Sequence, residues 1–238
     1  GIDRANISRL IYLATYIDYN DREENVLVRH GSNNKIEYLT RKDIQSIMRL
    51  SEKTFKVFMK DMKDNNLIWN ANDKFYVSNE YFCKGKSSFD KSKYTRIFID
   101  TTRELYENAS AREHKRLSYI YQLIGFINYE TNVLCSNPTE TDKSKLQKLS
   151  LKDICELLGV QTNSGGMCRF EHDLYKVYFT VNGEKYYAFS RVIVKGGNGH
   201  NDYFVINPAL IWKGSNTDKA KETIQWLYFT KSKKRSKA

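Results

Sequence analysis

The fold is decided by a stretch that opens with Leu39-Thr40-Arg41-Lys42-Asp43-Ile44, continues as Ser51-Glu52-Lys53-Thr54-Phe55-Lys56-Val57-Phe58-Met59-Lys60, and closes at Gly85. Thr40 stands three residues before Asp43, a capping-box spacing that marks the start of a helix. Apolar residues then recur at helical spacing, namely Ile44, Ile47 and Met48. The pattern predicts an amphipathic helix that lies on a hydrophobic core.

A second helix is predicted to begin at Ser51, whose hydroxyl can cap the first turn. Its apolar stripe recurs at i, i+3, i+4 and i+7 and consists of Phe55, Phe58, Met59 and Met62. Its other face carries ammonium groups, on Lys53, Lys56, Lys60 and Lys63. Two β-prone segments follow, Leu67-Ile68-Trp69 and Phe75-Tyr76-Val77. These segments predict a small hairpin.

The order helix, turn, basic helix, hairpin suits a protein that reads duplex DNA. The major groove admits one helix, phosphates flank that helix, and a hairpin can reach the neighbouring groove or backbone. This order resembles the winged-helix family of DNA-binding domains. Taken alone, the lysine stripe has an alternative interpretation as a solvated helix face.

The composition favours a polyanionic partner. The 238 residues suffice for one large domain or two smaller ones, and a hydrophobic share of 40% indicates a globular chain. A formal net charge of +11 favours nucleic acid or an anionic membrane surface. No apolar run approaches the roughly 20 residues that span a bilayer, and no signal peptide opens the chain, so we expect a cytoplasmic protein. The helical pattern of the first residues suggests that the natural protein begins before Gly1.

The cysteines indicate a reducing compartment. Cys83, Cys135, Cys155 and Cys168 show no paired CxxC spacing, and we expect reduced, mostly structural thiols. Cys168 and His172 lie four residues apart, as two ligands of one metal ion can, but no second ligand pair accompanies them. We therefore expect neither a metal site nor a cofactor.

The chain contains an internal repeat. Arg116-Leu117-Ser118-Tyr119 matches Arg9-Leu10-Ile11-Tyr12, and Asn132-Val133-Leu134 matches Asn25-Val26-Leu27, both at a shift of 107 (132 minus 25). Leu149-Ser150-Leu151-Lys152-Asp153-Ile154 then repeats Leu39 to Ile44, including the cap and its acidic partner. Tyr203-Phe204-Val205-Ile206-Asn207 repeats Phe75-Tyr76-Val77-Ser78-Asn79, and Lys213-Gly214 repeats Lys84-Gly85. The alternative is two unrelated helical domains that share some Leu and Lys.

The repeat predicts an α+β fold of two tandem winged-helix domains that arose by internal duplication. We expect the first domain over residues 1–86, a linker over 87–93, the second domain over 94–214, and a closing helix with a basic tail over 215–238. The other predicted elements are helices over 5–19 and 101–108, and strands over 25–28 and 94–99. The closing helix is expected over 217–228, with Ile224, Trp226, Leu227 and Phe229 as packing residues. The lysine-rich end either adds phosphate contacts or is disordered.

The second copy is predicted to read bases less strongly than the first. Thr162 is expected to cap a helix that runs to Val177, but this helix contains Gly165-Gly166 and carries Glu171 and Asp173. Its candidate DNA-binding residues are Asn163, Ser164, Arg169 and Lys176.

A longer wing is expected to compensate. It runs from Tyr186-Tyr187-Ala188-Phe189 to Lys195, turns through residues 196–201, and returns over 203–206. The glycine-rich tip is either a mobile turn or a close approach to DNA through Lys195, Asn198 and His200.

The whole chain resembles the tandem winged-helix proteins of low-GC Gram-positive phages and plasmids, which are described as replication initiators or helix-turn-helix regulators. The repeated phrases Arg-Leu-x-Tyr, Asn-Val-Leu and Leu-[Thr/Ser]-x-Lys-Asp-Ile carry the resemblance. It implies paired winged helices on origin repeats in a bacterial host cell. The implied partners are double-stranded DNA, a second copy of the chain, and replication or transcription proteins. Residues 94–108 have no counterpart before the first copy, which is a departure from a simple duplication.

Enzyme activity is not expected, because the sequence has no GxxxxGK[ST] loop, HxH pair, HExxH or GxSxG. Three roles remain: an origin-binding initiator or accessory, a regulator that binds promoter operators, and a partition or protein-interaction module. The residues predicted to enter the major groove are Ser51, Lys53, Thr54 and Lys56. Lys60 and Lys63 are expected on phosphates, and Arg41 and Lys42 on the neighbouring backbone.

Overall fold

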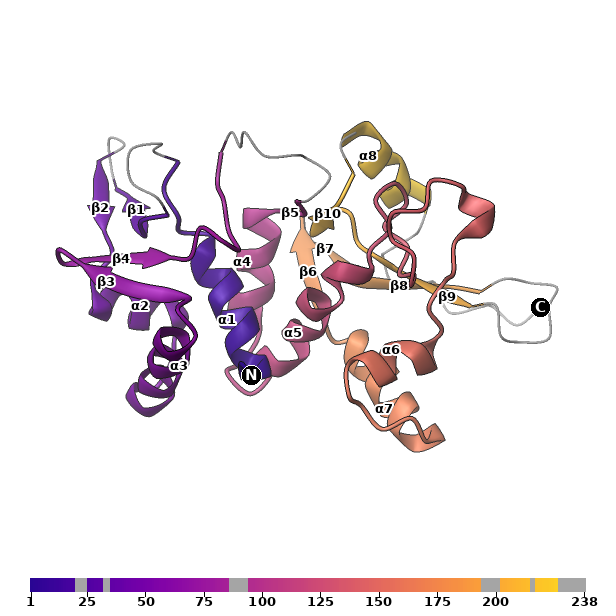
Figure 1. Cartoon of the computed structure of the whole chain (residues 1–238), viewed down its shortest axis with the longest axis horizontal. Coiled ribbons are helices and arrows are strands. Elements are labelled where there is room, and N and C mark those ends of the chain that lie inside the picture. Colours follow the sequence, from indigo (N-terminus) through magenta and orange to yellow (C-terminus); the bar gives the residue numbers. More distant parts are fainter. Residues whose placement is uncertain (20–24, 32–34, 86–93, 194–201, 215–216, 227–238) are drawn as a thin grey trace. The chain divides into compact units, whose positions relative to one another are not determined.

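A computed structural model describes residues 1–19, 25–31, 35–85, 94–193, 202–214 and 217–226 (Figure 1). Helices and small antiparallel sheets alternate along the chain, so the fold class is α+β. The chain divides into two compact units. Unit 1 comprises residues 1–89 and 109–118, and unit 2 comprises residues 90–108 and 119–238.

Unit 1 contains three helices and two hairpins among its described residues. Its elements are α1 (Arg4–Ala14), β1 (Val28–His30), β2 (Ile36–Tyr38), α2 (Arg41–Met48), α3 (Glu52–Asp64), β3 (Ile68–Ala71) and β4 (Lys74–Val77). β1 pairs with β2 and β3 pairs with β4, both antiparallel. A bridge between Val26 and Tyr76 connects the two hairpins.

Unit 2 begins with β5 (Arg96–Ile97) and α4 (Ile99–Asn108), and α5 (His114–Gln122) starts in unit 1 and ends in unit 2. The later elements are α6 (Leu151–Leu157), α7 (Ser164–Leu174), β6 (Tyr178–Val181), β7 (Glu184–Tyr187), β8 (Phe189–Val192), β9 (Tyr203–Ile206), β10 (Ile211–Trp212) and α8 (Thr217–Trp226). Two single 3-10 turns, Ile124–Phe126 and Lys143–Lys145, lie between α5 and α6. The antiparallel pairs are β6–β7, β8–β9 and β5–β10.

Helices α2 and α6 start with the same capping box, as the sequence predicts. The Thr40 and Ser150 hydroxyls accept the N–H of Asp43 and Asp153, at 3.3 and 3.2 Å. Each aspartate accepts the backbone N–H of its capping residue at 2.8 Å. Hydrogen bonds from the hydroxyl and the amide of the capping residue lower the pKa of both carboxyl groups.

Residues 109–118 belong to unit 1 because α1 holds them through buried polar contacts. The Arg9 side chain is buried and donates from Nε to His114 Nδ1 at 3.3 Å. The Ser8 hydroxyl donates to the His114 carbonyl at 2.8 Å. Burial and the Arg9 charge lower the pKa of His114 to about 4, so the imidazole is a neutral acceptor at neutral pH.

The two units form matching backbone hydrogen bonds where residues 25–27 meet β4 and residues 132–134 meet β9; we call these two segments the central strands. Leu27 N–H donates to the Phe75 carbonyl at 2.8 Å, and Leu134 N–H donates to the Phe204 carbonyl at 2.8 Å. The next bond is also present in both units, from Val77 N–H to the Asn25 carbonyl and from Ile206 N–H to the Asn132 carbonyl.

Asn25 and Asn132 have equivalent surroundings. Their φ angles are 53° and 56°, a left-handed conformation that asparagine tolerates better than most residues. Their side-chain amides donate to the carbonyls of Phe82 and Ile211 at 2.7 and 2.6 Å. The repeated phrase Asn-Val-Leu is therefore a structural requirement of both central strands.

The hydrogen bonds align Phe204 with Phe75, whereas the sequence comparison aligned Tyr203 with Phe75. A slip of one residue exchanges the two faces of a strand, and the buried residues decide the register. Phe75 and Val77 are buried in unit 1, as Phe204 and Ile206 are in unit 2. The corrected shift of 129 (204 minus 75) also aligns Lys213-Gly214 with Lys84-Gly85 without a gap.

Unit 2 contains a hairpin that the sequence analysis did not predict. Tyr186 and Tyr187, which were assigned to the start of the wing, lie in β7 and pair with β6. The turn at Asn182-Gly183 has φ angles of 52° and 80°, close to those of Asn72-Asp73 in β3–β4, at 48° and 60°. The next hairpin, β8–β9, contains the predicted return strand and bridges Val133.

The ends of several predicted elements were wrong. The helix predicted over 5–19 ends at Ala14, because Thr15 donates both its N–H and its hydroxyl to the Tyr12 carbonyl and Ile17 then bridges Leu27. The strand predicted over 94–99 is reduced to β5, and the helix predicted from residue 101 already begins at Ile99.

Some predictions lie outside the described residues. They concern the linker over 87–93, the wing tip with Lys195, Asn198 and His200, the packing residues Leu227 and Phe229, and the basic tail. Residues 217–226 of the closing helix are described as α8, while the side chains of Ile224 and Trp226 are not.

Candidate nucleic-acid interface

A three-residue turn joins α2 to α3. Arg49 adopts the left-handed conformation (φ 52°, ψ 38°) and its N–H donates to the Ser46 carbonyl. Leu50 is buried beneath the turn, and Ser51 is the N-cap of α3. A short turn with a buried anchor holds one helix at a defined angle to the next, as a helix-turn-helix requires.

Helix α3 has one fully buried face. Phe55, Phe58 and Met62 have no exposed surface, and Met59 is almost completely buried. The predicted apolar stripe is thereby confirmed. Because the packing of this stripe fixes the rotation of the helix, the opposite face points to solvent and carries four exposed side chains, Lys53, Lys56, Lys60 and Lys63.

Three of these lysines keep their charge available for a ligand. Lys56 forms an i, i+4 ion pair with Glu52, with 3.2 Å between Nζ and Oε1. In the part of the chain that the structure describes, Lys53, Lys60 and Lys63 form no ion pair. Exposed helix pairs such as Lys56–Glu52 are weak, about 0.3–0.5 kcal/mol, so a phosphate can compete for Lys56 as well.

One acidic side chain of α3, that of Asp61, is bound to the start of α1. Asp61 accepts the Asn6 side-chain amide at 2.6 Å and the Asp3 N–H at 3.3 Å. Both donors come from the start of α1, so this carboxylate ties α3 to α1.

Of the two hydroxyls predicted to enter the major groove, that of Ser51 caps the helix and that of Thr54 bonds to it. Ser51 Oγ accepts the Thr54 N–H at 3.3 Å and lies 2.9 Å from Thr54 Oγ1. At the start of α2, the Arg41 guanidinium lies over the Phe55 ring, 4.9 Å from its centroid, and Lys42 is exposed. Arg41 is thus brought close to the first turn of α3.

The corresponding part of unit 2 has a longer turn and a shorter helix. Six residues, 158–163, separate α6 from α7, and α7 has 11 residues where α3 has 13. The N-cap is Asn163, whose side-chain oxygen accepts the Gly166 N–H at 2.7 Å. The prediction that Thr162 caps this helix was therefore wrong.

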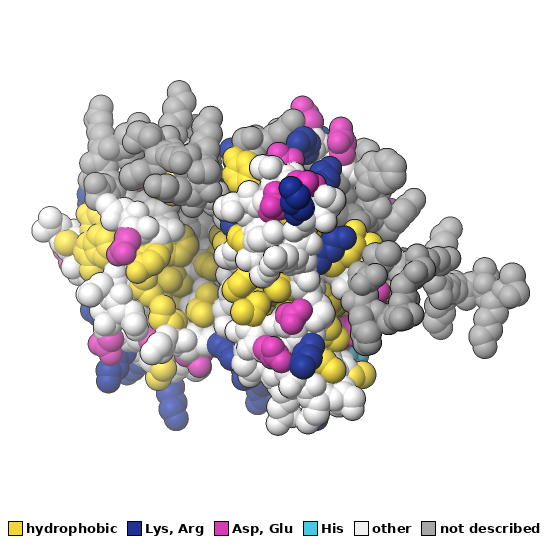
Figure 2. Space-filling view, turned by 45° about the vertical axis from the view of Figure 1, so that its right-hand side comes forward, with side chains coloured by type: hydrophobic (Ala, Val, Ile, Leu, Met, Phe, Trp, Pro, Cys, Tyr) yellow, Lys and Arg dark blue, Asp and Glu magenta, His cyan; other side chains and the backbone are white. Residues whose placement is uncertain are grey.

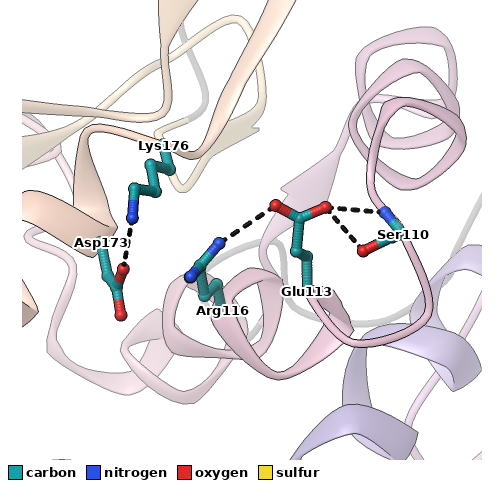
Figure 3. Close-up of polar contacts among 5 residues, drawn as sticks. All are labelled: Ser110, Glu113, Arg116, Asp173 and Lys176. Atoms are coloured by element: carbon teal, nitrogen blue, oxygen red, sulfur yellow. Dashed lines mark hydrogen bonds and ion pairs between the residues drawn. The ribbon is translucent and has the colours of Figure 1, made fainter.

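The polar groups of α7 are largely used within its own unit. Arg169 Nε donates to the Gly165 carbonyl at 3.1 Å. Lys176 pairs with Asp173, with 3.4 Å between Nζ and Oδ1, and Figure 3 shows the two side chains turned toward each other. Ser164, the first residue of α7, is exposed.

Glu171 on α7 has a partner that the sequence analysis missed. Arg191 on β8 contacts Glu171 at 2.6 Å and Asp202 at 2.7 Å. Although partial burial opposes the charge, the two carboxylates raise the pKa of Arg191. No local spacing links residues 20 positions apart, so only the fold reveals that this arginine joins α7 to the β8–β9 hairpin.

Gly166 is required by close packing. A Cβ atom at this position would lie 2.4 Å from the Gln161 carbonyl oxygen, a distance that real side chains do not reach. At Gly165 the nearest atoms would lie 3.9 Å away or more. Close packing therefore requires glycine at position 166 but not at position 165. The reason is that the long turn between α6 and α7 folds back onto the first turn of α7.

Local polar contacts also position the start of α5 and place opposite charges next to each other on the surface. Glu113 accepts the N–H and hydroxyl of Ser110 at 2.9 and 2.8 Å and pairs with Arg116 at 3.1 Å (Figure 3). In Figure 2 several Lys or Arg side chains lie beside Asp or Glu side chains on the visible face.

All four cysteines are free thiols, but only two of them are buried, as a structural role requires. Cys135 and Cys155 are buried free thiols, whereas Cys83 and Cys168 are exposed. Burial raises the pKa of the Cys135 thiol and raises that of Cys155 to about 11. Among the described helices, none combines the length and the apolar character needed to cross a membrane.

Comparisons with known proteins found no matching family model, no matching curated protein and no matching solved structure.

Proposed function

We propose that the chain is a sequence-specific double-stranded DNA-binding protein built from two copies of a winged-helix module. In this proposal α3 enters the major groove and supplies most of the base contacts. Lys53 and Lys56 lie on its first two turns, and Lys60 and Lys63 farther along reach phosphates. Unit 2 adds a second, weaker contact, which increases affinity because both modules belong to one chain.

The observation that carries the proposal is the division of α3 into two faces. Its buried face fixes the orientation of the helix, and its exposed face places four lysines in a row. A helix presented in this way, after a short turn and before a hairpin, has the arrangement that duplex DNA accommodates. The formal net charge of +11 adds long-range attraction to phosphates.

The matching hydrogen bonds of the central strands support the duplication. Leu27 and Leu134 bond to Phe75 and Phe204 in the same way, and the same capping box starts α2 and α6. The two units also differ, because in the described residues two hairpins, β6–β7 and β8–β9, follow α7, whereas only β3–β4 follows α3, and because the α6–α7 turn is longer.

The biological role proposed is that of a phage or plasmid origin-binding initiator or accessory that recognises repeated sites. The experiment that tests it is a pull-down of fragmented DNA from the source element at about 150 mM salt, followed by sequencing. Enrichment of an array of repeats supports an initiator or partition role. Enrichment of one or a few promoters supports a transcriptional regulator instead, and absence of any enriched sequence contradicts sequence-specific binding.

Salt dependence tests the binding mode independently of sequence. If the chain neutralises about 6–10 phosphates, its affinity for duplex DNA falls by about three to five decades between 50 and 200 mM salt. An affinity that does not depend on salt would contradict the phosphate contacts and favour a protein-interaction role.

A further inference from the structure

The exposed face of α3 contains one aliphatic side chain. Val57 is 58% exposed, although the next two residues, Phe58 and Met59, are buried. Among the residues of α3, all of which the structure describes, no other is both aliphatic and exposed. A β-branched side chain lowers helix propensity slightly, and an exposed one adds little to the core. Neither helix formation nor core packing therefore accounts for a valine at this position.

The surroundings of Val57 distinguish it from an isolated apolar residue on a surface. Lys53 lies four residues before it and Lys60 three residues after it, so both are its neighbours on the helix surface. Both lysines and the adjacent Lys56 are exposed. Lys53, Lys56 and Val57 follow the spacing i, i+3 and i+4, at which residues of a helix in the major groove reach base edges. Val57 thus belongs to the face that is proposed to enter DNA.

The chemistry of base edges limits what Val57 can recognise. In the major groove the four bases present hydrogen-bond donors and acceptors and, on thymine alone, a methyl group at C5. The valine side chain has no donor or acceptor, so it gains from contact with that methyl group. Against the polar edge of another base it would displace water without replacing the lost hydrogen bond, which costs free energy. Both effects favour thymine.

The neighbouring charges favour DNA over a protein as the partner of Val57. Burial of Val57 against an apolar protein surface would also remove the ammonium groups of Lys53 and Lys60 from water, which is costly for unpaired charges. Phosphates on either side of the major groove offer these ammonium groups an opposite charge. An aliphatic side chain between cations therefore fits a groove that has an apolar methyl group inside and anions at its edges.

The corresponding position of α7 carries a different side chain. When the two N-caps are aligned (163 minus 51, a shift of 112), the buried Phe58 coincides with the buried Phe170, and Val57 coincides with Arg169. Arg169 is exposed, and a guanidinium matches the O6 and N7 acceptors of guanine, not a methyl group. A contact that depends on the thymine methyl group is therefore expected from unit 1 only.

We propose that Val57 is a specificity-determining residue of α3, which contacts the 5-methyl group of a thymine in the major groove and so selects an A·T pair at that position. This inference rests on the proposed function, because it requires α3 to lie in the major groove. It adds the identity of one base pair that the helix selects.

Replacement of thymine by deoxyuridine tests the contact, because it removes the methyl group and leaves every hydrogen-bonding group of the base pair in place. The probe is the duplex enriched in the DNA pull-down, in which each thymine of both strands is replaced in turn. For the full chain, replacement at one position should weaken binding about fourfold, the effect expected for one buried methyl group. Fluorescence anisotropy at constant salt measures the affinity.

Variants of the chain assign the effect to Val57. Val57→Ala removes both γ-methyl groups and should bind the thymine and deoxyuridine duplexes equally. This variant is expected to fold, because Val57 is exposed and alanine favours a helix. Val57→Ile keeps the methyl groups and should retain the fourfold response. Lys53→Ala, and Arg169→Ala as the matched control on α7, should retain it as well, whatever their overall affinity.

The outcomes separate this inference from the proposed function. If the chain binds the enriched duplex specifically but no deoxyuridine replacement weakens binding, the thymine contact is wrong and sequence-specific binding stands. The same conclusion follows if Val57→Ala responds to every replacement as the unaltered chain does. If no sequence is enriched at all, the proposed function fails, and this inference fails with it.

Discussion

Helices α3 and α7 follow the same kind of capped helix in their units, yet they offer a ligand different chemistry. Lys53, Lys60 and Lys63 on α3 form no ion pair within the described chain, whereas Arg169 on α7 and Lys176 just after α7 contact groups of α7. The backbone bonds of the central strands are the same in both units. Hydrogen bonding therefore constrains the backbone of both units in the same way, whereas the side chains on the exposed face of the helix differ between them.

The largest expected effect tests whether the two frameworks are separate folding units. Phe58→Ala in unit 1 and Phe170→Ala in unit 2 each remove a buried ring and should lower the free energy of unfolding by about 3–5 kcal/mol. Hydrogen exchange followed by mass spectrometry should show the loss of protection confined to the mutated unit. Equal loss in both units would mean that they unfold together.

The next prediction concerns DNA affinity. Lys53→Ala should cost about 1–3 kcal/mol and relax the preference at one base pair, because Lys53 lies on the first turn of α3. Lys60→Ala should weaken all sequences alike and reduce the salt slope by about 1. Lys176→Ala is the matched control in unit 2 and should have a smaller effect, measured by fluorescence anisotropy at several salt concentrations. Equal effects in both units would contradict the proposed dominance of α3.

The glycine pair of α7 separates packing from helix propensity. Gly166→Ala should destabilise unit 2 by about 1–3 kcal/mol, because the added methyl group collides with the Gln161 carbonyl. Gly165→Ala has room and should stabilise the helix by up to about 1 kcal/mol. The melting temperature should therefore fall for Gly166→Ala and rise for Gly165→Ala. An unchanged stability of Gly166→Ala would show that the α6–α7 turn can shift to accommodate the added methyl group.

The smallest expected effect concerns the two capping boxes and pH. The pKa values of Asp43 and Asp153 are lower in the folded chain than in the unfolded chain. Their contribution to stability is therefore present above about pH 4 and is lost as the pH falls through the folded pKa. Asp43→Asn or Asp153→Asn should cost about 0.5–1 kcal/mol at pH 7 and less at pH 3, as measured by urea unfolding. A cost that does not change with pH would argue against the charged cap.

Features that depend on neighbouring residues were predictable from the sequence. The spacing of Thr40 and Asp43 indicates the start of α2. The apolar stripe of α3 was predicted residue by residue. The pairing of Lys56 with Glu52 is also a local event, because residues four apart share one face of a helix. Such features need no knowledge of the rest of the chain.

Features that depend on distant residues were not predictable. The contact of Arg191 with Glu171 brings together a helix and a strand 20 residues apart. The register of β9 was misjudged by one residue because similar side chains stand at adjacent positions, Tyr203 and Phe204, and only their burial separates them. The β6–β7 hairpin did carry a signal, Asn182-Gly183 between two β-prone segments, which was overlooked when Tyr186-Tyr187 was assigned to the wing.

The candidate site shows the same division. Sequence spacing identified which side chains share the exposed face of α3. Spacing does not reveal that Ser51 and Thr54 bond to each other, nor that Asn163 is a cap. Each of these side chains can either bond at the start of its helix or contact DNA. Only the three-dimensional structure shows which hydrogen bonds are already formed.

The cation–aromatic contacts Lys74–Tyr38 and Lys148–Tyr203, with 4.0 and 4.2 Å between the ammonium nitrogen and the ring centroid, are one interaction with its partners exchanged. Tyr38 and Lys148 precede α2 and α6 by the same distance, and Lys74 and Tyr203 occupy matching places on β4 and β9 under the shift of 129 (203 minus 74). At each of the two positions the residues differ between the units. In both units, however, the two residues together place a cation above an aromatic ring. Exchange of both residues in unit 1 at once, Tyr38→Lys with Lys74→Tyr, should therefore be tolerated better than either change alone. The two units thus share the kind of contact although they share neither residue identity.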